Sequence, residues 1–425
     1  MTNSTLTQDS LVVQKYGGTS IATPAHICKI ADRIVGQYKE VKGLVIVLSA
    51  MGSTTDNLVS LANEVTENPK GREMDLLLST GEQVSVSLLG LALQARGIPA
   101  VSLTAIQCGI KTDNTFNIAK IQSINTERIQ AELAQRRVVI VTGFQGATAN
   151  HEITTLGRGG SDITGSAVAA AIKADVCEIY TDVDGVFSAD PNIVPSAKLW
   201  LEITYEEAIE MTSSGAKVLH PRAAEVCKAY DIPIHIRSSF HMRDGTWIRR
   251  GDEMTMEQAA VVGIASNRKV AKITLLDLPD RPGLAAQVFQ DLAVEDVNVR
   301  LIIQSSSSDE HGRITFVLDE DYVDRAGKLI EHWKKEGVAK EGIVERNVAK
   351  ISIVGSRLAS TPGLAAQMFS ALARKGINID CISSSEMKVA CVISEEELDQ
   401  AVKAVHDEFF PENKNVKSTE NSERK

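Results

Sequence analysis

The chain has 425 residues, more than a single core normally organises, so we expect two or three domains. Its net charge of −10 argues against a nucleic-acid partner and leaves local cations to attract any anionic ligand. No run approaches the ~20 apolar residues that span a membrane, and the polar segment 1–10 carries no secretory signal. Six cysteines without CxxC spacing indicate buried, reduced thiols in a cytoplasmic protein.

The first element along the chain is an apolar run, 11–16, which predicts a strand with Lys15 near its carboxyl end. Gly17 and Gly18 follow at once, and a helix is expected to begin near Ala25. Glycines leave backbone N–H groups open to an anion, and the lysine adds a positive charge. Taken alone, the segment fits equally well a tight turn with a surface lysine. It matches neither the Walker loop nor the GxGxxG dinucleotide fingerprint.

Four short apolar runs follow between helical patterns, at residues 44–48, 99–103, 137–141 and 176–180. Strands that are covered on both faces read as nearly continuous apolar runs, so the pattern predicts an α/β fold with a mostly parallel sheet. Ligands of such sheets bind at the carboxyl ends of the strands. Both glycine loops and the turns after residues 48 and 180 are expected there.

A second glycine loop, 157–162, opens a helix and contains Arg158. A guanidinium beside bare backbone suits a carboxylate or a phosphate, which we favour over an exposed arginine before a capped helix start. Glu82 lies where one helical pattern ends and another begins, which is also an ordinary place for a glutamate. The loop 181–191 fits either a series of β-turns or a nucleotide-holding loop with Phe187 against the base.

After about Val261 an internal repeat appears. The string Pro-Gly-Leu-Ala-Ala-Gln at 282–287 recurs at 362–367, and 297–299 recurs at 377–379, with the same offset of 80 residues. Each copy reads strand, Pro-Gly turn, helix and further strands, so we expect two small α+β modules that pack as a pair. The polar segment 411–425 predicts a frayed tail.

Together these strings resemble the aspartokinases of the amino-acid-kinase family, over about residues 11–410. The resemblance implies an α/β fold with a mostly parallel central sheet in a kinase domain, followed by two α+β ACT (ferredoxin-like) modules. It implies these boundaries: a polar tail 1–10, the kinase domain 11–260, the first ACT module 261–347, the second 348–410 and a polar tail 411–425.

The reaction implied by the resemblance is ATP plus L-aspartate giving 4-phospho-L-aspartate, which opens lysine, threonine and methionine synthesis. The acceptor carboxylate has an ordinary pKa of about 3.9 and is ionised at neutral pH, so no general base is needed. What is needed is alignment and charge neutralisation, with Mg²⁺ bound to ATP and no dedicated protein metal ligands.

By resemblance, Lys15 would stabilise the transferring phosphoryl group, Arg158 would pair with the substrate α-carboxylate and Glu82 would hold its ammonium. The catalytic set implied is Lys15, Glu82, Arg158 and Asp182. The ATP contacts implied are Lys15, Tyr16, Gly17, Gly18, Ser49, Thr181, Asp182, Phe187, Ser188, Ala189, Asp190, Pro191 and Lys217. The aspartate contacts implied are Ser49, Thr54, Thr55, Glu82, Arg158, Gly159, Gly160 and Ser161.

The ACT modules imply feedback by lysine, threonine or both. In the first module the implied effector contacts are Asp280, Arg281, Pro282, Gly283, Asn298 and Gln304. In the second they are Thr361, Pro362, Gly363, Asn378, Ile379, Ser383, Ser384, Ser385 and Glu386. The first module has Arg300 where the usual motif has aspartate, so we expect the two effector sites to differ. Asn192 replaces a frequent arginine after Pro191, which removes a basic contact there.

The resemblance also implies a homo-oligomer of two or four chains, or assembly with a shorter subunit from an internal start at Met254 or Met256. Two rival functions remain open. One is another amino-acid kinase, for glutamate, acetylglutamate or uridylate. The other is an amino-acid sensor that keeps the kinase fold without turnover. The paired C-terminal modules argue against the first rival, and the intact Lys15 and Arg158 argue against the second.

Overall fold

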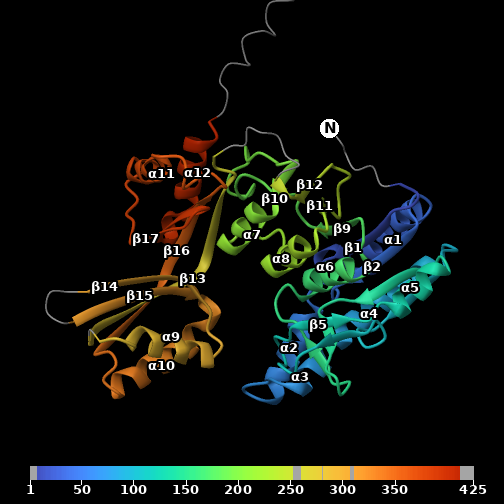
Figure 1. The fold of residues 1–425 in the computed structure, drawn as a ribbon, viewed down its shortest axis with the longest axis horizontal. Helices are drawn as coiled ribbons and strands as arrows, with labels where there is room; N and C mark the ends of the chain where they lie inside the picture. Colours follow the sequence, from blue (N-terminus) through green and yellow to red (C-terminus); the bar gives the residue numbers. More distant parts are fainter. Residues whose placement is uncertain (1–6, 252–259, 280, 307–310, 412–425) are drawn as a thin grey trace, which may run out of the picture. The chain divides into compact units, whose positions relative to one another are not determined.

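The computed structural model describes residues 7–251, 260–279, 281–306 and 311–411. The chain divides into two compact units (Figure 1). The first unit comprises Met1–Phe187, Leu199–Ser213 and Lys217–Glu257. The second comprises Ser188–Lys198, Ser214–Ala216 and Gln258–Lys425. The main division lies close to the boundary expected near residue 260, but two inserted segments of the expected kinase domain belong to the second unit.

The first unit is built on an eight-stranded sheet with the order β10-β12-β11-β9-β1-β2-β6-β3. Its strands are β1 (Leu11–Tyr16), β2 (Gly43–Leu48), β3 (Ala100–Leu103), β6 (Val138–Thr142), β9 (Val176–Thr181), β10 (Glu202–Thr204), β11 (Ile234–Ser238) and β12 (Thr246–Arg249). The six strands from β11 to β3 pair in parallel, and only β12 runs antiparallel to its neighbour β11. Every residue of β2 and β6 is buried. The predicted α/β fold is confirmed.

Helices cover both faces of this sheet (Figure 1). They are α1 (Pro24–Tyr38), α2 (Thr54–Val65), α3 (Arg72–Leu78), α4 (Thr80–Gln94), α5 (Glu127–Ala134), α6 (Gly160–Ile172), α7 (Tyr205–Ser214) and α8 (Pro221–Tyr230), after a short 3₁₀ turn η1 (Thr19–Ile21). α1 and α4 pack on the face that contains Val12 and Tyr16, and α6 contacts β1, β2 and β9. α1 begins with Pro24 in its first turn, where Thr23 accepts a hydrogen bond from the His26 N–H.

A smaller four-stranded sheet, with the order β5-β4-β7-β8, completes the first unit. Its strands are β4 (Ile110–Thr112), β5 (Ile121–Ile124), β7 (Gln145–Ala147) and β8 (Ile153–Thr155). β8 leads directly into the second glycine loop, and β7 follows the carboxyl end of β6. This sheet therefore supports the second glycine loop, which the sequence singled out.

One described stretch, Arg72–Gln94, is long and apolar enough to cross a membrane, which the inspection of the sequence did not detect. Half of its most apolar window is buried inside the protein, and the stretch consists of α3 followed by α4. Core helices of globular domains pass the same test, so this is weak evidence for a membrane span. The described cysteines are all free, and Cys28 on α1 is exposed, unlike the other five.

The second unit has a six-stranded antiparallel sheet with the order β14-β15-β13-β16-β18-β17. Its strands are β13 (Gly263–Pro279), β14 (Val299–Ser306), β15 (His311–Asp319), β16 (Glu341–Val354), β17 (Cys381–Ser384) and β18 (Lys388–Ser394). Its helices are α9 (Leu284–Val294), α10 (Val323–Lys335), α11 (Leu364–Ala373) and α12 (Leu398–Phe409), with 3₁₀ turns η3 (Glu320–Tyr322) and η4 (Glu395–Glu397). Gly283 and Gly363 precede α9 and α11 with nearly equal left-handed φ values of 92° and 93°, so the repeat read from the sequence is structural.

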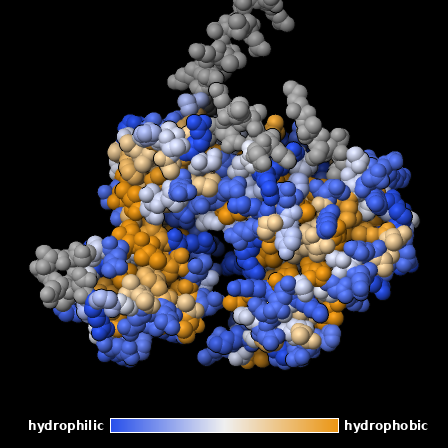
Figure 2. All heavy atoms as spheres, in the orientation of Figure 1, coloured by the Kyte–Doolittle hydropathy of each residue, from blue (hydrophilic) through white to orange (hydrophobic). Residues whose placement is uncertain are grey.

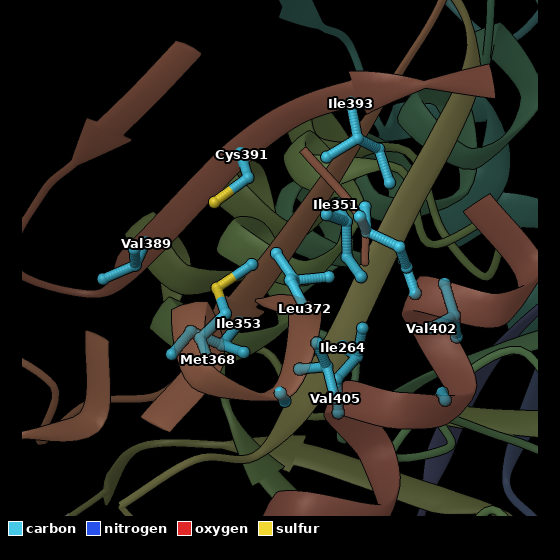
Figure 3. Packing of buried hydrophobic residues seen from close by; sticks show 14 of the residues in the cluster. Ile264, Ile351, Ile353, Met368, Leu372, Val389, Cys391, Ile393, Val402 and Val405 are labelled. Atoms are coloured by element: carbon cyan, nitrogen blue, oxygen red, sulfur yellow. The ribbon is translucent and has the colours of Figure 1, made fainter. Parts of the chain in front are cut away.

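The two repeats share their central strands. The first part of β13, 263–267, pairs with 350–354 of β16, and its later part, 270–276, pairs with 341–348. The expected boundary between residues 347 and 348 therefore falls inside β16. Each repeat nevertheless has its own apolar core, one around Phe316 and Trp333 and one around Met368 and Leu372 (Figure 3).

Several apolar side chains of this sheet stay exposed. Ile302 is 53% exposed and Ile382 is 46% exposed, while Ile343 and Val344 are exposed by 39% and 37%. Figure 2 shows apolar surface in orange over this unit, among polar side chains in blue. Apolar surface of this kind is typical of protein association.

Candidate active site

Lys15 lies near the carboxyl end of β1, and its Nζ is 2.5 Å from Oδ1 of Asp162 in the first turn of α6. The two side chains are 12% and 13% exposed, so the pair is shielded but open to a ligand. Oδ2 of Asp162 also accepts a hydrogen bond from the His220 N–H, at 3.1 Å. The sequence marked Asp162 only as the last residue of the second glycine loop. A carboxylate after the second glycine loop was the available signal, since parallel strands bring such loops to one edge of the sheet.

The loop after β1 interlocks with the loop after β2. The Ser49 N–H donates to the Tyr16 carbonyl at 3.2 Å, and the Gly52 N–H donates to the Gly18 carbonyl at 3.0 Å. A Cβ atom on Gly18 would lie 2.9 Å from the Ala50 carbonyl oxygen, closer than real Cβ atoms approach. A glycine is therefore required at position 18. The interlock places Lys15 and Ser49 at the ends of adjacent strands.

Glu82 is buried directly behind the second of these loops and is 2% exposed. Its Oε1 accepts the Ala50 N–H at 3.1 Å, and its Oε2 accepts Nε2 of Gln145 at 2.8 Å. Burial raises the pKa of Glu82 to about 7, against the opposing effect of these hydrogen bonds. Ser85, one turn further along α4, donates to the Ser49 carbonyl at 2.7 Å. The carboxylate is thus held in one orientation beside the loop that contains Ser49.

Thr54 and Thr55 begin α2, and both are half-buried. The Thr54 hydroxyl donates to the Met51 carbonyl at 2.6 Å, so this threonine shapes the loop that ends at α2. Thr55 follows on the same helix turn.

The second glycine loop rises from β8 to α6. Gly159 has a left-handed φ of 69°, and a Cβ atom there would lie 2.3 Å from the His220 ring. Gly160 and Ser161 are buried at the first turn of α6, and Arg158 and Gly159 are exposed. The loop thus presents an exposed guanidinium on a backbone that only glycine permits.

Asp75 is hydrogen-bonded to Thr155, just before the second glycine loop. The sequence did not predict this role. Asp75 is fully buried. Its carboxylate accepts the Asn117 N–H at 2.9 Å and Nδ2 at 2.5 Å, and the Thr155 N–H at 2.9 Å and Oγ1 at 2.6 Å. A buried carboxylate with four donors is well compensated. Nothing in the local sequence distinguished Asp75 from an ordinary helix-surface aspartate.

The expected nucleotide loop is divided between the two units. Thr181 ends β9 and donates to Oδ1 of the exposed Asp182 at 3.1 Å. The half-buried Phe187 pairs with Leu199, and the exposed Lys217 lies on a separate segment of the same unit. All four expected contacts, Thr181, Asp182, Phe187 and Lys217, thus belong to the first unit.

The remaining residues of that loop belong to the second unit. Ser188 is fully buried and Ala189 is 3% exposed. Oδ1 of the exposed Asp190 accepts both the backbone N–H of Asn192 and its Nδ2, and Pro191 lies between them. The side chains of Ser188 and Ala189, expected to contact ATP, are instead packed inside the protein.

The first repeat has a cavity of about 310 Å³ at its Pro-Gly turn. Of the expected effector contacts, Arg281, Pro282, Gly283 and Gln304 line it. Asn298 is exposed outside that lining, and Asp280 lies outside the described residues.

In the second repeat, Thr361, Pro362 and Gly363 precede α11 as their counterparts precede α9. Asn378 and Ile379 come shortly before β17, and Ser383 and Ser384 lie in it. Ser385 lies in the turn to β18, where its N–H donates to the Lys388 carbonyl, and the Glu386 carbonyl accepts the Ala359 N–H.

The departure at Arg300 is accommodated by an ion pair. Arg300 contacts Asp319 at 2.7 Å, whereas Asp380, its counterpart in the second repeat, contacts Lys272 at 3.2 Å. The charges at these positions are thus opposite in the two repeats, and each has a partner.

Comparisons with known proteins agree with this architecture. The amino acid kinase family matches residues 10–238, and the ACT domain matches 277–332 and 351–409. The chain is 44% identical to the aspartate kinase of Pseudomonas putida over 400 residues, with 94% of this chain and 97% of that one covered. It is also 44% identical to aspartokinase 2 of Bacillus subtilis, again over 400 residues with 94% and 97% covered.

Among solved structures, aspartokinase III of Escherichia coli with aspartate and ADP superposes with a TM-score of 0.81 at 26% identity, covering 94% of this chain and all of that one. The aspartate kinase of Synechocystis matches with 43% identity and a TM-score of 0.53, covering 94% of this chain and 69% of that one. A kinase fold followed by paired ACT domains defines the class. The chain belongs to the amino acid kinase family and, within it, to the aspartate kinases, which use ATP.

Proposed function

We propose that the protein transfers the γ-phosphoryl group of ATP to the side-chain carboxylate of L-aspartate and forms 4-phospho-L-aspartate. The observation that carries this proposal is the placement of the Lys15–Asp162 pair and the buried Glu82 around the interlocked loops after β1 and β2. A solved relative, aspartokinase III of Escherichia coli, was crystallised with aspartate and ADP.

The chemistry requires two anions to meet. Aspartate arrives with an ionised carboxylate, so the barrier comes from alignment and from repulsion by the triphosphate. In the proposed mechanism, the Lys15 ammonium neutralises charge on the transferring group. Asp162 holds Lys15 by its ion pair, which keeps the ammonium oriented before substrates bind.

Substrate selection falls to two loops. Arg158 would pair with the α-carboxylate of aspartate through its two parallel N–H groups. Glu82 would hold the α-ammonium, and the ammonium would in turn favour the ionised form of a carboxyl whose pKa burial raises to about 7. Ser49, Thr55 and Ser161 would line the remaining wall. A substrate without an α-ammonium would leave Glu82 buried without a cation.

We propose Mg²⁺ as the ion that accompanies ATP. Among the described residues no group of three or more histidine, cysteine, aspartate or glutamate side chains could hold a metal. The exposed Asp182 offers one carboxylate at the end of β9. This donor set fits an ion bound chiefly by phosphate oxygens and waters. When bound, the ion would neutralise phosphate charge.

We propose feedback inhibition by lysine, threonine or both through the ACT repeats. Aspartokinase III of Escherichia coli has also been crystallised with lysine and aspartate, and the first repeat has a cavity at its Pro-Gly turn. We further propose a cytoplasmic oligomer of two or four chains, or an assembly with a shorter subunit, which the exposed Ile302 and Ile382 would favour. Met254 and Met256, the suggested internal starts, lie outside the described residues.

The deciding experiment is initial-rate kinetics with ATP and aspartate, in which ADP release and the acyl phosphate, trapped by hydroxylamine, are both measured. We expect the two signals to rise together with aspartate and to stay at background with glutamate, acetylglutamate or uridylate. Binding of aspartate and ATP without either signal would instead identify an amino-acid sensor. Turnover with another acceptor alone would identify a different amino-acid kinase.

A further inference from the structure

The segment Ser188–Lys198, called here the inserted hairpin, leaves the first unit in the middle of the expected ATP loop and joins the second unit. Its Ala189 and Val194 are 3% and 4% exposed and belong to the apolar core of the second repeat. Figure 3 shows that core, in which Ile264, Met368, Leu372 and Val405 converge from strands and helices. The last four residues of the expected ATP loop, 188–191, therefore belong to a segment that is anchored in the core of the second repeat.

Ser188 is the first residue of the inserted hairpin, and each of its polar groups is hydrogen-bonded. Its N–H donates to the Lys198 carbonyl at 2.9 Å, and its carbonyl accepts the Ile264 N–H at 2.7 Å. Its Oγ accepts the Lys198 N–H at 2.8 Å and lies 2.9 Å from Nε2 of His406. The hairpin, β13 and α12 thus meet at one fully buried serine.

His406 is 2% exposed in α12, and its ring stacks on Phe410 with the centroids 5.0 Å apart. Burial lowers its pKa, against a smaller opposing effect of Asp407, so the ring is neutral at neutral pH. Its Nδ1 has no hydrogen-bond partner among the described residues. Burying a ring nitrogen without a hydrogen bond is unfavourable, so packing alone does not explain a histidine at this position. The hydrogen bond between Nε2 and Ser188 is the polar contact that offsets this cost.

The first repeat provides an internal comparison. When Ala326 and Ile330 of α10 are aligned with Ala401 and Val405 of α12, the position of His406 is occupied by Glu331. The Glu331 side chain is 63% exposed and contacts Lys334. The buried histidine is therefore specific to the repeat that receives the inserted hairpin.

We propose that His406 is a positioning residue for the nucleotide, because its bond to Ser188 fixes the peptide link to Phe187. A peptide bond is planar, so only two soft backbone angles separate a fixed Ser188 from the orientation of Phe187. Phe187 is the side chain expected to lie against the adenine, and it also forms an isolated antiparallel bridge with Leu199, where the chain returns to the first unit. This inference rests on the proposed role of residues 181–187 in holding ATP.

The test compares His406→Leu, Ser188→Ala, their double variant and His406→Gln, which keeps an amide nitrogen near the position of Nε2. We expect His406→Leu to raise the KM for ATP and the ADP dissociation constant about five-fold, the effect of losing one ordinary hydrogen bond, and to leave the KM for aspartate unchanged. Ser188→Ala should match it, the double variant should be no worse than either, and His406→Gln should recover most of the loss. Glu331→Leu is the matched control and should change neither constant.

An unchanged ADP dissociation constant in folded Ser188→Ala and His406→Leu would overturn the proposal, and so would an equal rise of both KM values. If His406→Leu does not fold, Ser188→Ala and His406→Gln still decide. ADP binding measured by calorimetry needs no turnover, so a protein that bound ADP normally but never phosphorylated aspartate would refute the proposed function and leave the role of His406 testable.

Discussion

The first unit buries carboxylates, whereas the described residues of the second unit bury none. Asp75, Glu82 and Glu178 are 0%, 2% and 1% exposed in the first unit. The buried polar residues of the second unit are Ser188, Ser214, Thr315, Lys350, Ser352 and His406. Its interior is otherwise apolar, in cores around Trp333 and Met368.

The difference has a physical reason. A buried carboxylate costs several kcal/mol unless donors surround it, and each of these three has donors. Glu178, for example, accepts Nε2 of Gln14 at 2.6 Å and Nη1 of Arg237 at 3.1 Å. Such networks fix loops and charges in one geometry, which phosphoryl transfer needs. Apolar packing suffices for the second unit. Substitutions should therefore alter chemistry in the first unit and mainly stability or coupling in the second.

The largest effect is expected at the ion pair of the first unit. Lys15→Ala removes the cation that we propose stabilises the transferring phosphoryl group, so kcat should fall about thousandfold, equivalent to about 4 kcal/mol. The melting temperature should also fall, because the two side chains are only 12% and 13% exposed and Asp162 loses its cation. Lys29→Ala, at an exposed lysine of α1, is the control for loss of charge. A Lys15→Ala enzyme with normal kcat would remove Lys15 from the mechanism.

The second unit should respond through packing. Met368→Ala removes a fully buried side chain from the core of the second repeat, and we expect a loss of about 3 kcal/mol in the free energy of unfolding. Urea titration followed by circular dichroism measures this loss. Met242→Ala, at a side chain that is 79% exposed, should stay within about 0.5 kcal/mol of the unmodified protein. Equal stability of the two variants would contradict the packing argument.

Asp75→Asn tests whether the hydrogen bonds of this buried carboxylate hold the second glycine loop in the geometry that binds aspartate. The amide would point N–H groups at donors from Asn117 and Thr155, so stability should fall by about 2 kcal/mol. Because Thr155 leads into the second glycine loop, the KM for aspartate should also rise more than the KM for ATP. Asp56→Asn, at an exposed aspartate of α2, should do neither. A stability loss with both KM values unchanged would restrict Asp75 to a structural role.

The raised pKa of Glu82 predicts that both activity and stability depend on pH. Each pH unit changes the free energy of protonating the carboxylate by about 1.4 kcal/mol. In the proposed mechanism only the ionised carboxylate attracts the α-ammonium, so kcat/KM for aspartate should fall about tenfold per pH unit below about pH 7. The folded state binds this proton more tightly than the unfolded state does. The contribution of Glu82 to stability therefore declines as pH rises from its ordinary pKa near 4.5 to about 7. Glu82→Gln should abolish both pH dependences. If kcat/KM of that variant still falls below pH 7 as in the unmodified protein, the titrating group is not Glu82.

Much of this organisation was predictable from local patterns. The strand and loop around Lys15, the second glycine loop, the junction before Glu82 and the two repeats all follow from short-range sequence features. The Lys15–Asp162 pair, the donors to Asp75 and the Ser188–His406 bond do not follow from such features, because each joins residues that are far apart in the sequence. Thr155 is 80 positions from Asp75, and Ser188 is 218 positions from His406. The expected boundary at residue 347 falls inside β16, because this strand continues its pattern through both repeats.

The smallest effect is expected where the two repeats differ in charge. Arg300→Asp breaks the pair with Asp319, which is partly exposed and contributes little to stability. Arg300 lies on β14 four residues before Gln304, which lines the cavity proposed for the effector, so the reversed charge should shift half-inhibition by lysine or threonine about threefold. Combining Arg300→Asp with Asp319→Arg should restore it, and Arg346→Asp, at another exposed pair of the same repeat, should leave it unchanged. Identical lysine and threonine titrations in Arg300→Asp and the unmodified protein would show that this charge does not distinguish the repeats.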